Sequence, residues 1–355
     1  MKMKTKIVFF LATLNGGGAE RVTITLMRQL DPQKFEIFLI LVSKEGPLLA
    51  QVPKNVTIIN LKSKRTLFSV FSLRRNLKKI RADIIYSTLF RTHIAIDLAL
   101  INLQKKPKTI FISPSSPKLL FSRKEISAAM KYFIDRAYRR ADIVLAQTPE
   151  MKDEISKYHK IDSHKITVFL NPVDTKMIDE KIKKTKNLFN PNVINIVAAG
   201  RLSDVKGFDI LLYAFRKVLD KDSTFYLNII GRDAGEEQNL KDLAKKLLIE
   251  DKVKFWGYQE NPFQFFFFSD LFILSSRREG LPNAVLENIY LKKPIIATRC
   301  IPYMSELIDD SSGFLVDVED SQALSDAILK YKRMNVNDYN YMDKLVDINN
   351  FFTKV

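Results

Sequence analysis

The sequence predicts an α/β protein with two domains, each built on a parallel β-sheet. Short apolar runs alternate with longer amphipathic segments along the chain, and this alternation is typical of parallel sheets with helices on both faces. The alternation occurs in two sets, separated by the lysine-rich, weakly apolar stretch 176–192, which we expect to connect the domains. At 355 residues the chain is long enough for two domains with full cores.

The first set of elements is expected to form a domain over residues 1–175 and the second set a domain over 176–335, followed by a tail at 336–355. In the first domain we expect strands at 6–14, 35–42, 56–61, 84–87, 109–112, 143–146 and 166–169. We expect its helices at about 20–29, 67–80, 92–103, 122–140 and 149–158. In the second domain we expect strands at 193–199, 225–230, 253–255, 271–274, 294–297 and 313–316.

The first apolar run, 7–14, imitates a signal peptide because it follows a lysine-rich start. It lacks a small-residue cleavage site and leads directly into three glycines, so we interpret it as the first strand and expect a cytosolic protein. No apolar run approaches the roughly 18 residues that a membrane-spanning helix needs. The single cysteine, Cys300, excludes an internal disulfide and a cysteine-based zinc site, and we interpret it as a buried or incidental thiol.

The chain is strongly basic, with 57 Lys and Arg, 40 Asp and Glu, and a net charge of +17. The stretch 62–81 holds eight basic residues and no acidic one, with apolar residues at helical spacing between them, and a second basic stretch spans 119–140. Anionic lipid headgroups attract such surfaces by about 1 kcal/mol per Lys or Arg. We therefore predict a peripheral contact with the inner face of the cytoplasmic membrane. Nucleic acid is the rival partner, but no nucleic-acid-binding fingerprint is visible.

Two glutamates eight residues apart, Glu279 and Glu287, are the most informative feature of the chain. The apolar run 271–274 before them is typical of a buried strand, and the sequence Gly-Leu-Pro-Asn at 280–283 ends it and opens a helix. Glu279 is thus expected on the loop and Glu287 about one turn inside the helix. The unpaired N–H groups at the helix start suit a phosphate, and a carboxylate on each side can accept hydrogen bonds from two sugars. The pattern fits a nucleotide-sugar.

Two further loops carry residues that suit a diphosphate. Arg201 and Lys206 follow the buried strand expected at 193–199, and open α/β sheets bind ligands at such strand ends. Three glycines at 16–18 follow the first strand and precede a helix, which allows close approach of a phosphate. Alone, each feature could be a solvated charge or a flexible turn, but together with the glutamate pair they favour a binding site.

These segments resemble the retaining glycosyltransferases of family 4 (glycosyl transferases group 1), which have the GT-B fold. The resemblance extends over about residues 6–330. It implies two Rossmann-like domains that face each other across a cleft. The first domain would bind the acceptor, the second would bind the nucleotide-sugar donor, and a helix within 336–355 would cross back to the first domain.

The resemblance also implies roles for single residues. Arg201 and Lys206 would grip the donor diphosphate, and Glu279 would orient the donor sugar and stabilise charge, so these three are the predicted catalytic residues. Glu287 would hold the ribose hydroxyls. The other donor-binding residues that the resemblance implies are Gly17, Gly18, Gly231, Tyr258, Gly280, Leu281, Pro282, Asn283, Ala284 and Val285.

No metal and no cofactor are expected. Arg201, Lys206 and the helix start supply positive potential for the leaving diphosphate, whereas the single Asp-x-Asp sequence, 220–222, falls at an expected helix end. The family retains anomeric configuration, and front-face attack requires no protein nucleophile. Many relatives carry a histidine after the strand expected at 109–112, where this chain has serine and proline. His93, Ser113 or Ser115 could take its place.

The predicted function is transfer of a hexose or N-acetylhexosamine to a lipid-linked or polysaccharide acceptor in surface-glycan biosynthesis. We expect UDP rather than GDP in the donor. Two alternatives stay open: a sugar-nucleotide epimerase on the same fold, and a non-catalytic protein that binds nucleotide-sugars or nucleic acid.

Overall fold

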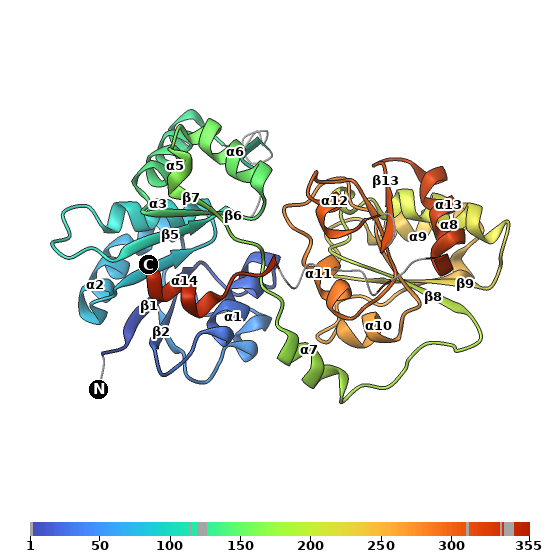
Figure 1. Ribbon diagram of the computed structural model, residues 1–355, viewed down its shortest axis with the longest axis horizontal. Coiled ribbons are helices and arrows are strands. Elements are labelled where there is room, and N and C mark those ends of the chain that lie inside the picture. Colours follow the sequence, from blue (N-terminus) through green and yellow to red (C-terminus); the bar gives the residue numbers. More distant parts are fainter. Residues whose placement is uncertain (1–2, 114–115, 119–125, 310–311, 334–335, 337–343) are drawn as a thin grey trace. The chain divides into compact units, whose positions relative to one another are not determined.

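The computed structural model describes residues 3–113, 116–118, 126–309, 312–333, 336 and 344–355. The chain divides into two compact units, one formed by 1–172 with 345–355 and the other by 173–344. Each unit is built on one parallel sheet with helices packed on it (Figure 1). The prediction of two parallel-sheet α/β domains is confirmed. Within the described residues, no helix is both long enough and apolar enough to cross a membrane.

The first unit contains a seven-stranded sheet with the order β3-β2-β1-β4-β5-β6-β7. Its strands are β1 (Thr5–Leu11), β2 (Phe35–Leu41), β3 (Thr57–Asn60), β4 (Ile84–Ser87), β5 (Lys108–Ile112), β6 (Ile143–Ala146) and β7 (Ile166–Val168). Its described α-helices are α1 (Gly18–Gln29), α2 (Val70–Ile80), α3 (Phe90–Ala99), α5 (Ala128–Arg140), α6 (Pro149–His159) and α14 (Ile348–Lys354). Short 3-10 helices are η1 (Pro47–Gln51), η2 (Thr66–Ser69) and η3 (Ser163–Lys165).

The second unit contains a six-stranded sheet with the order β10-β9-β8-β11-β12-β13. Its strands are β8 (Ile194–Ala199), β9 (Phe225–Ile230), β10 (Val253–Phe255), β11 (Leu271–Leu274), β12 (Ile295–Thr298) and β13 (Gly313–Val316). Its α-helices are α7 (Thr175–Ile182), α8 (Phe208–Leu219), α9 (Glu237–Lys246), α10 (Phe263–Phe268), α11 (Asn283–Tyr290), α12 (Met304–Leu307) and α13 (Ser321–Lys330). Short 3-10 helices are η4 (Asp204–Lys206), η5 (Glu250–Lys252) and η6 (Tyr331–Arg333).

Alternation along β1 distributes its side chains to two cores. Val8 and Phe10 pack with α2, α3 and α5 on one face of the sheet, whereas Ile7, Phe9 and Leu11 pack with α1 and α14 on the other. Because successive side chains of a strand point to opposite faces, a strand covered on both sides is apolar throughout. This explains why the interior strands could be located in the sequence from their continuous apolar runs.

The C-terminal helix α14 belongs to the first unit. Phe352 lies in the core, with ring centroids 6.4 Å from Phe9 and 6.5 Å from Tyr86. Asn349 accepts a hydrogen bond from the Asp31 amide at 2.7 Å. The boundaries between the two units fall at 172/173 and 344/345, whereas the sequence predicted boundaries at 175/176 and 335/336.

The stretch 176–192, which we expected to connect the domains, lies within the second unit. Most of α7 lies in this stretch, and it packs against α10 within the second unit. Phe189 is buried against Phe265, with ring centroids 5.9 Å apart. The many lysines concealed this packing, because a few apolar side chains are enough to hold one short amphipathic helix.

Several element ends also differ from expectation. β1 ends at Leu11 rather than at residue 14, and the helix expected at 67–80 begins as the 3-10 helix η2 before α2. α3 ends at Ala99 rather than at 103. The start expected for the fourth helix, 122–125, lies outside the described residues.

Candidate functional site

The predicted catalytic residues lie in the loops that follow β8 and β11, the two central strands of the second sheet. The chain winds outward from this pair in opposite directions, to β9 and β10 on one side and to β12 and β13 on the other. Open parallel sheets bind ligands beyond the carboxyl ends of their strands at such a reversal of strand order. The loops that follow β8 and β11 are therefore where the topology favours a ligand.

Lys206 and Glu279 meet at this point. Lys206 ends η4 in the loop after β8, and its Nζ donates a hydrogen bond to Oε1 of Glu279, in the loop after β11. Ser276 Oγ donates to the same carboxylate oxygen at 2.8 Å. The Lys206 and Glu279 side chains are only 20% and 14% exposed. The site thus holds a shielded cation next to a shielded anion.

Hydrogen bonds to main-chain carbonyls hold the two loops against each other. Ser275 Oγ donates to the Lys206 carbonyl at 2.9 Å, and the Arg277 amide donates to the Val205 carbonyl at 2.8 Å. Gly207 adopts φ +60°, and a Cβ there would lie 2.2 Å from the Ser275 carbonyl oxygen. Only glycine meets both requirements, so Gly207 fixes the close approach of the loops.

A pair of glycines makes room for the Lys206 side chain. A Cβ on Gly200 would lie 3.0 Å from Cε of Lys206, which runs across that residue. A Cβ on Gly231 would lie only 1.6 Å from the Gly200 carbonyl oxygen. Gly231, at the end of β9, therefore supports the turn over which Lys206 lies.

Other predicted donor-binding residues lie on the loops at the same edge of the sheet. Arg201 follows β8 with an exposed side chain. Tyr258 follows β10 and is 46% exposed, with the Arg232 guanidinium carbon 5.3 Å from its ring centroid. The Gly231 amide donates to the Gly257 carbonyl at 3.0 Å, which ties the β9 and β10 loops together.

The helix predicted after the first glutamate is α11. It starts at Asn283, its N-cap residue Pro282 makes no side-chain cap hydrogen bond, and Glu287 is half-buried in its second turn. Leu281 and Val285 are buried and anchor the start of the helix. The remaining predicted residues of this segment, Gly280 and Ala284, are half-buried beside them. The positive end of the helix dipole at this position suits an anionic group.

Cys300 was not predicted to belong to the site, yet it lies beside it. It follows β12, the neighbour of β11, and burial together with the Glu279 carboxylate raises the pKa of its thiol to about 12. The thiol is thus protonated at neutral pH and is not a nucleophile. Only the strand order brings it close to Glu279, so no local sequence pattern could have indicated this position.

The glycine loop belongs to the first unit. Gly17 is the N-cap of α1 and Gly18 its first residue, and a Cβ on Gly17 would lie 2.3 Å from a Glu20 carboxylate oxygen. Their contact with the donor stays a prediction, as do the other residue roles.

His93 is a core residue of the first unit. It stacks on Phe111 at 4.4 Å between ring centroids, its Nε2 lies 3.1 Å from the Ser87 carbonyl oxygen, and burial lowers its pKa to about 3. Its buried position gives no support to the role considered for it from the sequence. Ser113, the second candidate, is also buried, and Ser115 lies outside the described residues.

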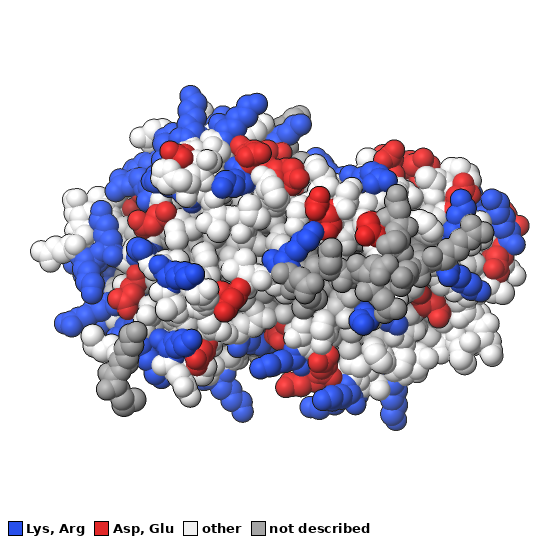
Figure 2. Space-filling view, in the orientation of Figure 1, with Lys and Arg blue, Asp and Glu red and all other residues white. Residues whose placement is uncertain are grey.

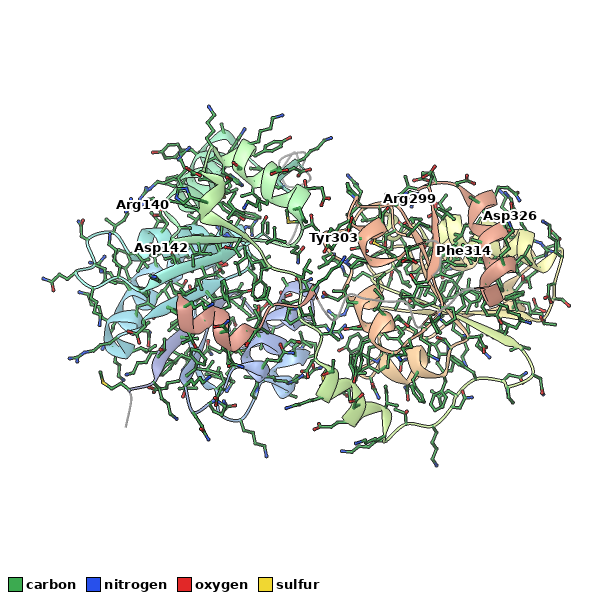
Figure 3. The ribbon with its side chains drawn as sticks, viewed as in Figure 1. Arg140, Asp142, Arg299, Tyr303, Phe314 and Asp326 are labelled. Atoms are coloured by element: carbon green, nitrogen blue, oxygen red, sulfur yellow. The ribbon has the colours of Figure 1, made fainter. Side chains whose placement is uncertain are left out.

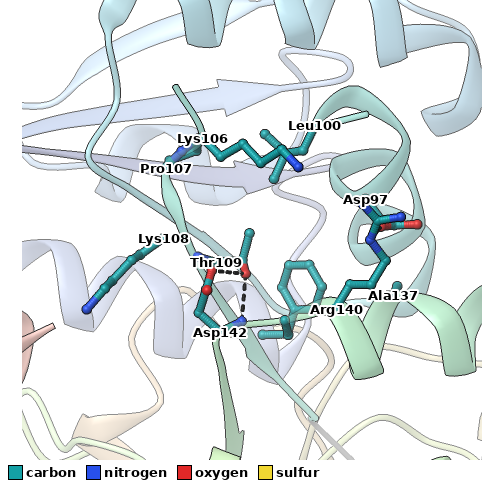
Figure 4. Close-up of a pocket in the computed structure, with 11 residues that line it drawn as sticks. Asp97, Leu100, Lys106, Pro107, Lys108, Thr109, Ala137, Arg140 and Asp142 are labelled. Carbon is teal, nitrogen blue, oxygen red and sulfur yellow. Dashed lines mark hydrogen bonds and ion pairs between the residues drawn. The ribbon is translucent and has the colours of Figure 1, made fainter. Parts of the chain in front are cut away.

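In the first unit, a pocket of about 290 Å³ lies at the amino ends of β5 and β6 (Figure 4). Asp97 in its wall pairs with Arg136 and Arg140, each at 3.1 Å. Thr109 Oγ1 donates to Asp142 at 2.7 Å. Arg140 and Asp142 come from α5 and the turn before β6 (Figure 3). Because these charged groups already satisfy one another at the amino ends of the strands, the pocket is a weaker candidate than the β8–β11 site.

Among the described residues, no group of three or more His, Cys, Asp or Glu side chains is arranged to hold a metal ion. The Asp-x-Asp sequence lies in an exposed turn after α8. There Asp220 pairs with Arg216, and Asp222 accepts a hydrogen bond from Thr224 Oγ1 at 2.5 Å.

Two parallel-sheet units with an ion pair at the topological switch point match the architecture of the GT-B glycosyltransferases. Family comparison makes this specific. The glycosyl transferases group 1 family matches residues 179–345, and glycosyltransferase family 4 matches residues 16–177. The chain belongs to the group 1 glycosyltransferases, so the predicted family and its GT-B fold are confirmed.

Individual proteins agree with this assignment. The chain is 30% identical over 268 residues to an uncharacterized glycosyltransferase of Methanocaldococcus jannaschii. The matched region covers 70% of this chain and 64% of that protein. It is 24% identical over 332 residues to the N-acetylgalactosamine-N,N'-diacetylbacillosaminyl-diphospho-undecaprenol 4-alpha-N-acetylgalactosaminyltransferase of Campylobacter jejuni, covering 90% and 88%. The crystal structure of Anabaena HepE in complex with UDP and glucose has a TM-score of 0.75 at 18% identity, covering 99% and 98%.

Proposed function

We propose that this glycosyltransferase moves a hexose or N-acetylhexosamine, with retention of configuration, from a UDP-sugar to a lipid-linked or polysaccharide acceptor in surface-glycan biosynthesis. The observation that carries the proposal is the shielded Lys206–Glu279 pair at the β8–β11 switch point. UDP in the HepE structure supports UDP over GDP. The diphospho-undecaprenol named for the Campylobacter jejuni relative supports a lipid-linked acceptor.

The chemistry follows from the charges in the site. An arriving diphosphate competes for Lys206 Nζ, since a phosphate accepts a stronger charge-assisted hydrogen bond from it than a single carboxylate does. Glu279 is then released to orient the donor sugar and to stabilise the oxocarbenium-like transition state. The exposed Arg201 and the start of α11 add positive potential, and Glu287 holds the ribose hydroxyls.

The reaction balances without a protein nucleophile. The bond between the anomeric carbon and the diphosphate oxygen breaks, and a bond from that carbon to the acceptor oxygen forms on the same face. The acceptor hydroxyl proton passes to the leaving phosphate oxygen. In this proposal Lys206 and Arg201 neutralise the leaving group, so no metal ion takes part.

The proposal includes a peripheral contact of the first unit with an anionic membrane, at the inner face of the cytoplasmic membrane. The basic stretch 62–81 forms η2 and α2, and Lys and Arg side chains gather over this part of the first unit (Figure 2). Leu73, Leu77 and Ile80 face the core, whereas Phe68 and Phe71 are 70% and 86% exposed. Two projecting aromatic rings within a basic surface suit a bilayer interface.

The second basic stretch, 119–140, offers less unpaired positive charge to a membrane than its sequence indicates. Arg136 and Arg140 of α5 both pair with Asp97, which neutralises part of their charge. Tyr132, on the same helix, is 58% exposed. The η2–α2 surface therefore carries the membrane proposal.

A donor screen tests the transferase. UDP- and GDP-sugars are titrated in the presence of a chelator against the wild type, Lys206→Ala and Glu287→Ala. Lys241→Ala is the matched control, because Lys241 pairs with Glu237 at 2.6 Å on the surface of α9 in the same unit. We expect saturable, chelator-resistant binding of a UDP-sugar that weakens at least tenfold in both site variants, given about 1.5–3 kcal/mol per charge-assisted hydrogen bond. Absence of nucleotide-sugar binding in the wild type would refute the transferase, and interconversion of two UDP-sugars without acceptor would indicate an epimerase.

Vesicle co-sedimentation tests the membrane contact. With vesicles that contain phosphatidylserine, we expect Phe68→Ser with Phe71→Ser to reduce binding at least tenfold, because each buried aromatic side chain contributes about 1.5–3 kcal/mol. Tyr213→Ser, which changes an aromatic residue of α8 that is 42% exposed, is the control. Equal binding by the double variant and the wild type would contradict the proposed surface, and so would salt-sensitive binding to RNA in place of vesicles.

A further inference from the structure

Arg277 lies two residues before Glu279, and its guanidinium group bonds to two other segments. Nη1 and Nη2 donate to the two carboxylate oxygens of Asp209, at 2.9 and 2.7 Å. Nε and Nη2 donate to the Glu319 carboxylate, and Nη1 also donates to the Asp204 carbonyl. The Arg277 side chain is only 18% exposed. Arg277 thus joins the loops after β8, β11 and β13.

These bonds hold both members of the catalytic pair. Asp204 begins η4, which Lys206 ends, and Asp209 lies in the first turn of the following helix, α8. The main-chain amide of Arg277 bonds to the carbonyl of Val205, next to Lys206. A fork-to-fork bond between arginine and carboxylate fixes orientation as well as distance. Arg277 therefore ties the segment that contains Lys206 to the loop that contains Glu279.

Arg277 also balances the negative charge of its neighbours. Three carboxylates face this one guanidinium group, because Asp204 Oδ1 also lies 3.3 Å from it, beside the carboxylates of Asp209 and Glu319. The hydrogen bond with Asp209, more than the one with Glu319, raises the pKa of Arg277, although burial opposes this. Without the guanidinium, uncompensated negative charge would remain beside the loops that are proposed to bind a diphosphate.

We infer that Arg277 is a positioning residue of the transferase: it aligns Lys206 with Glu279 and shields the donor diphosphate from the carboxylates of Asp204, Asp209 and Glu319. The inference rests on the proposed function, since the donor site is the one proposed above. It makes Arg277, which touches neither sugar nor phosphate, a determinant of donor affinity.

Steady-state kinetics with the donor found in the screen test this inference. We expect Arg277→Ala to raise the donor KM more than about tenfold and to lower kcat, since small displacements of reacting groups cost up to about a hundredfold. Arg277→Lys should give an intermediate KM, because lysine supplies the charge but not the fork. Adding Asp209→Asn to Arg277→Ala should lower KM again at least threefold, because it removes the uncompensated charge. Loss of folding alone would not produce that rescue.

The control is Arg216→Ala, which removes a surface arginine of α8 that pairs with Asp220. It should leave KM and kcat within twofold of the wild type. Arg277→Ala with wild-type kinetics, or with a lower Tm and unchanged kcat/KM, would overturn the inference. If Arg277→Ala does not fold, Arg277→Lys and Asp209→Asn provide the same comparison. If the wild type neither binds nor uses any donor, and Lys206→Ala behaves like the wild type, the proposed function itself fails.

Discussion

Lys206 and Glu279 lie 73 positions apart in the chain, yet the Lys206 ammonium donates a hydrogen bond to the Glu279 carboxylate. The pair forms because β8 and β11 are adjacent although they are not consecutive in the sequence. Both side chains are largely buried, where an unpaired charge would be costly. The pair thus presents a cation that we propose to bind the diphosphate and an anion that we propose to orient the sugar.

The first prediction separates these two roles. Glu279→Gln keeps the shape of the side chain but removes its charge, and it leaves Lys206 with a weaker partner. We expect UDP to bind as tightly as to the wild type or more tightly. We expect kcat to fall by about 10²–10³, the usual effect of losing one electrostatic contact to the transition state.

Isothermal titration of UDP and initial-rate kinetics measure these two effects. Glu237→Gln, which alters the surface carboxylate paired with Lys241, is the matched control and should change neither. Wild-type turnover in Glu279→Gln would show that the carboxylate does not act on the sugar.

A second prediction concerns the glycine that supports the turn under Lys206. Gly231→Ala places a methyl group where the Gly200 carbonyl oxygen stands, 1.6 Å from the ideal Cβ position. The backbone has to shift, which costs about 1–3 kcal/mol or more and displaces Lys206. Chemical denaturation should show this loss, and donor affinity should fall with it.

Gly235→Ala is the control for this substitution. A Cβ at Gly235 meets nothing within 4 Å, but its φ of +100° is unfavourable for alanine. We expect a cost of about 1 kcal/mol from the backbone alone, with unchanged donor affinity. Equal losses of affinity in both variants would show that crowding at Gly200 is not the cause.

Much of the fold could be predicted because its strands are covered on both faces. β4, β6 and β11 begin and end at the residues expected from their continuous apolar runs. The lysine-rich helix α7 was missed, since its sequence offers few apolar side chains. Local sequence thus located strands well and short polar helices poorly.

The candidate site divides in the same way. Glu279 and Lys206 could be proposed from loops that follow recognisable strands. The roles of Arg277 and Cys300 could not, because their partners lie on other loops that only the strand order brings close. Side-chain pairing across a sheet edge depends on topology, which one sequence does not specify.

A third prediction concerns the C-terminal helix. Phe352→Ala should destabilise the first unit by about 3–5 kcal/mol, because the ring is 1% exposed and packs against Phe9 and Tyr86. Urea denaturation followed by hydrogen exchange in β1 measures the loss. Phe68→Ala removes an equally large ring that is 70% exposed and should stay within about 0.5 kcal/mol of the wild type. An equally small effect at Phe352 would mean that α14 is not required by the first unit.

The fourth prediction is a pH dependence of stability. Burial lowers the pKa of His93 to about 3 in the folded chain, whereas an unfolded histidine has a pKa of about 6.5. Between these values the unfolded state binds a proton that the folded state does not, so the free energy of unfolding rises with pH in this window. The free energy of unfolding therefore decreases as the pH falls below 6.5, by up to about 1.4 kcal/mol per pH unit.

His93→Phe tests this dependence, because phenylalanine preserves the stack on Phe111 and cannot take up a proton. The variant gives up the contact with the Ser87 carbonyl, which lowers its stability at all pH values rather than changing the slope. We expect a shallower decline of Tm from pH 6.5 to pH 4 than in the wild type. Some slope should remain, because burial also lowers the pKa of His159, although Asp135 opposes this. Identical slopes for His93→Phe and the wild type would show that His93 is not the group whose protonation destabilises the fold.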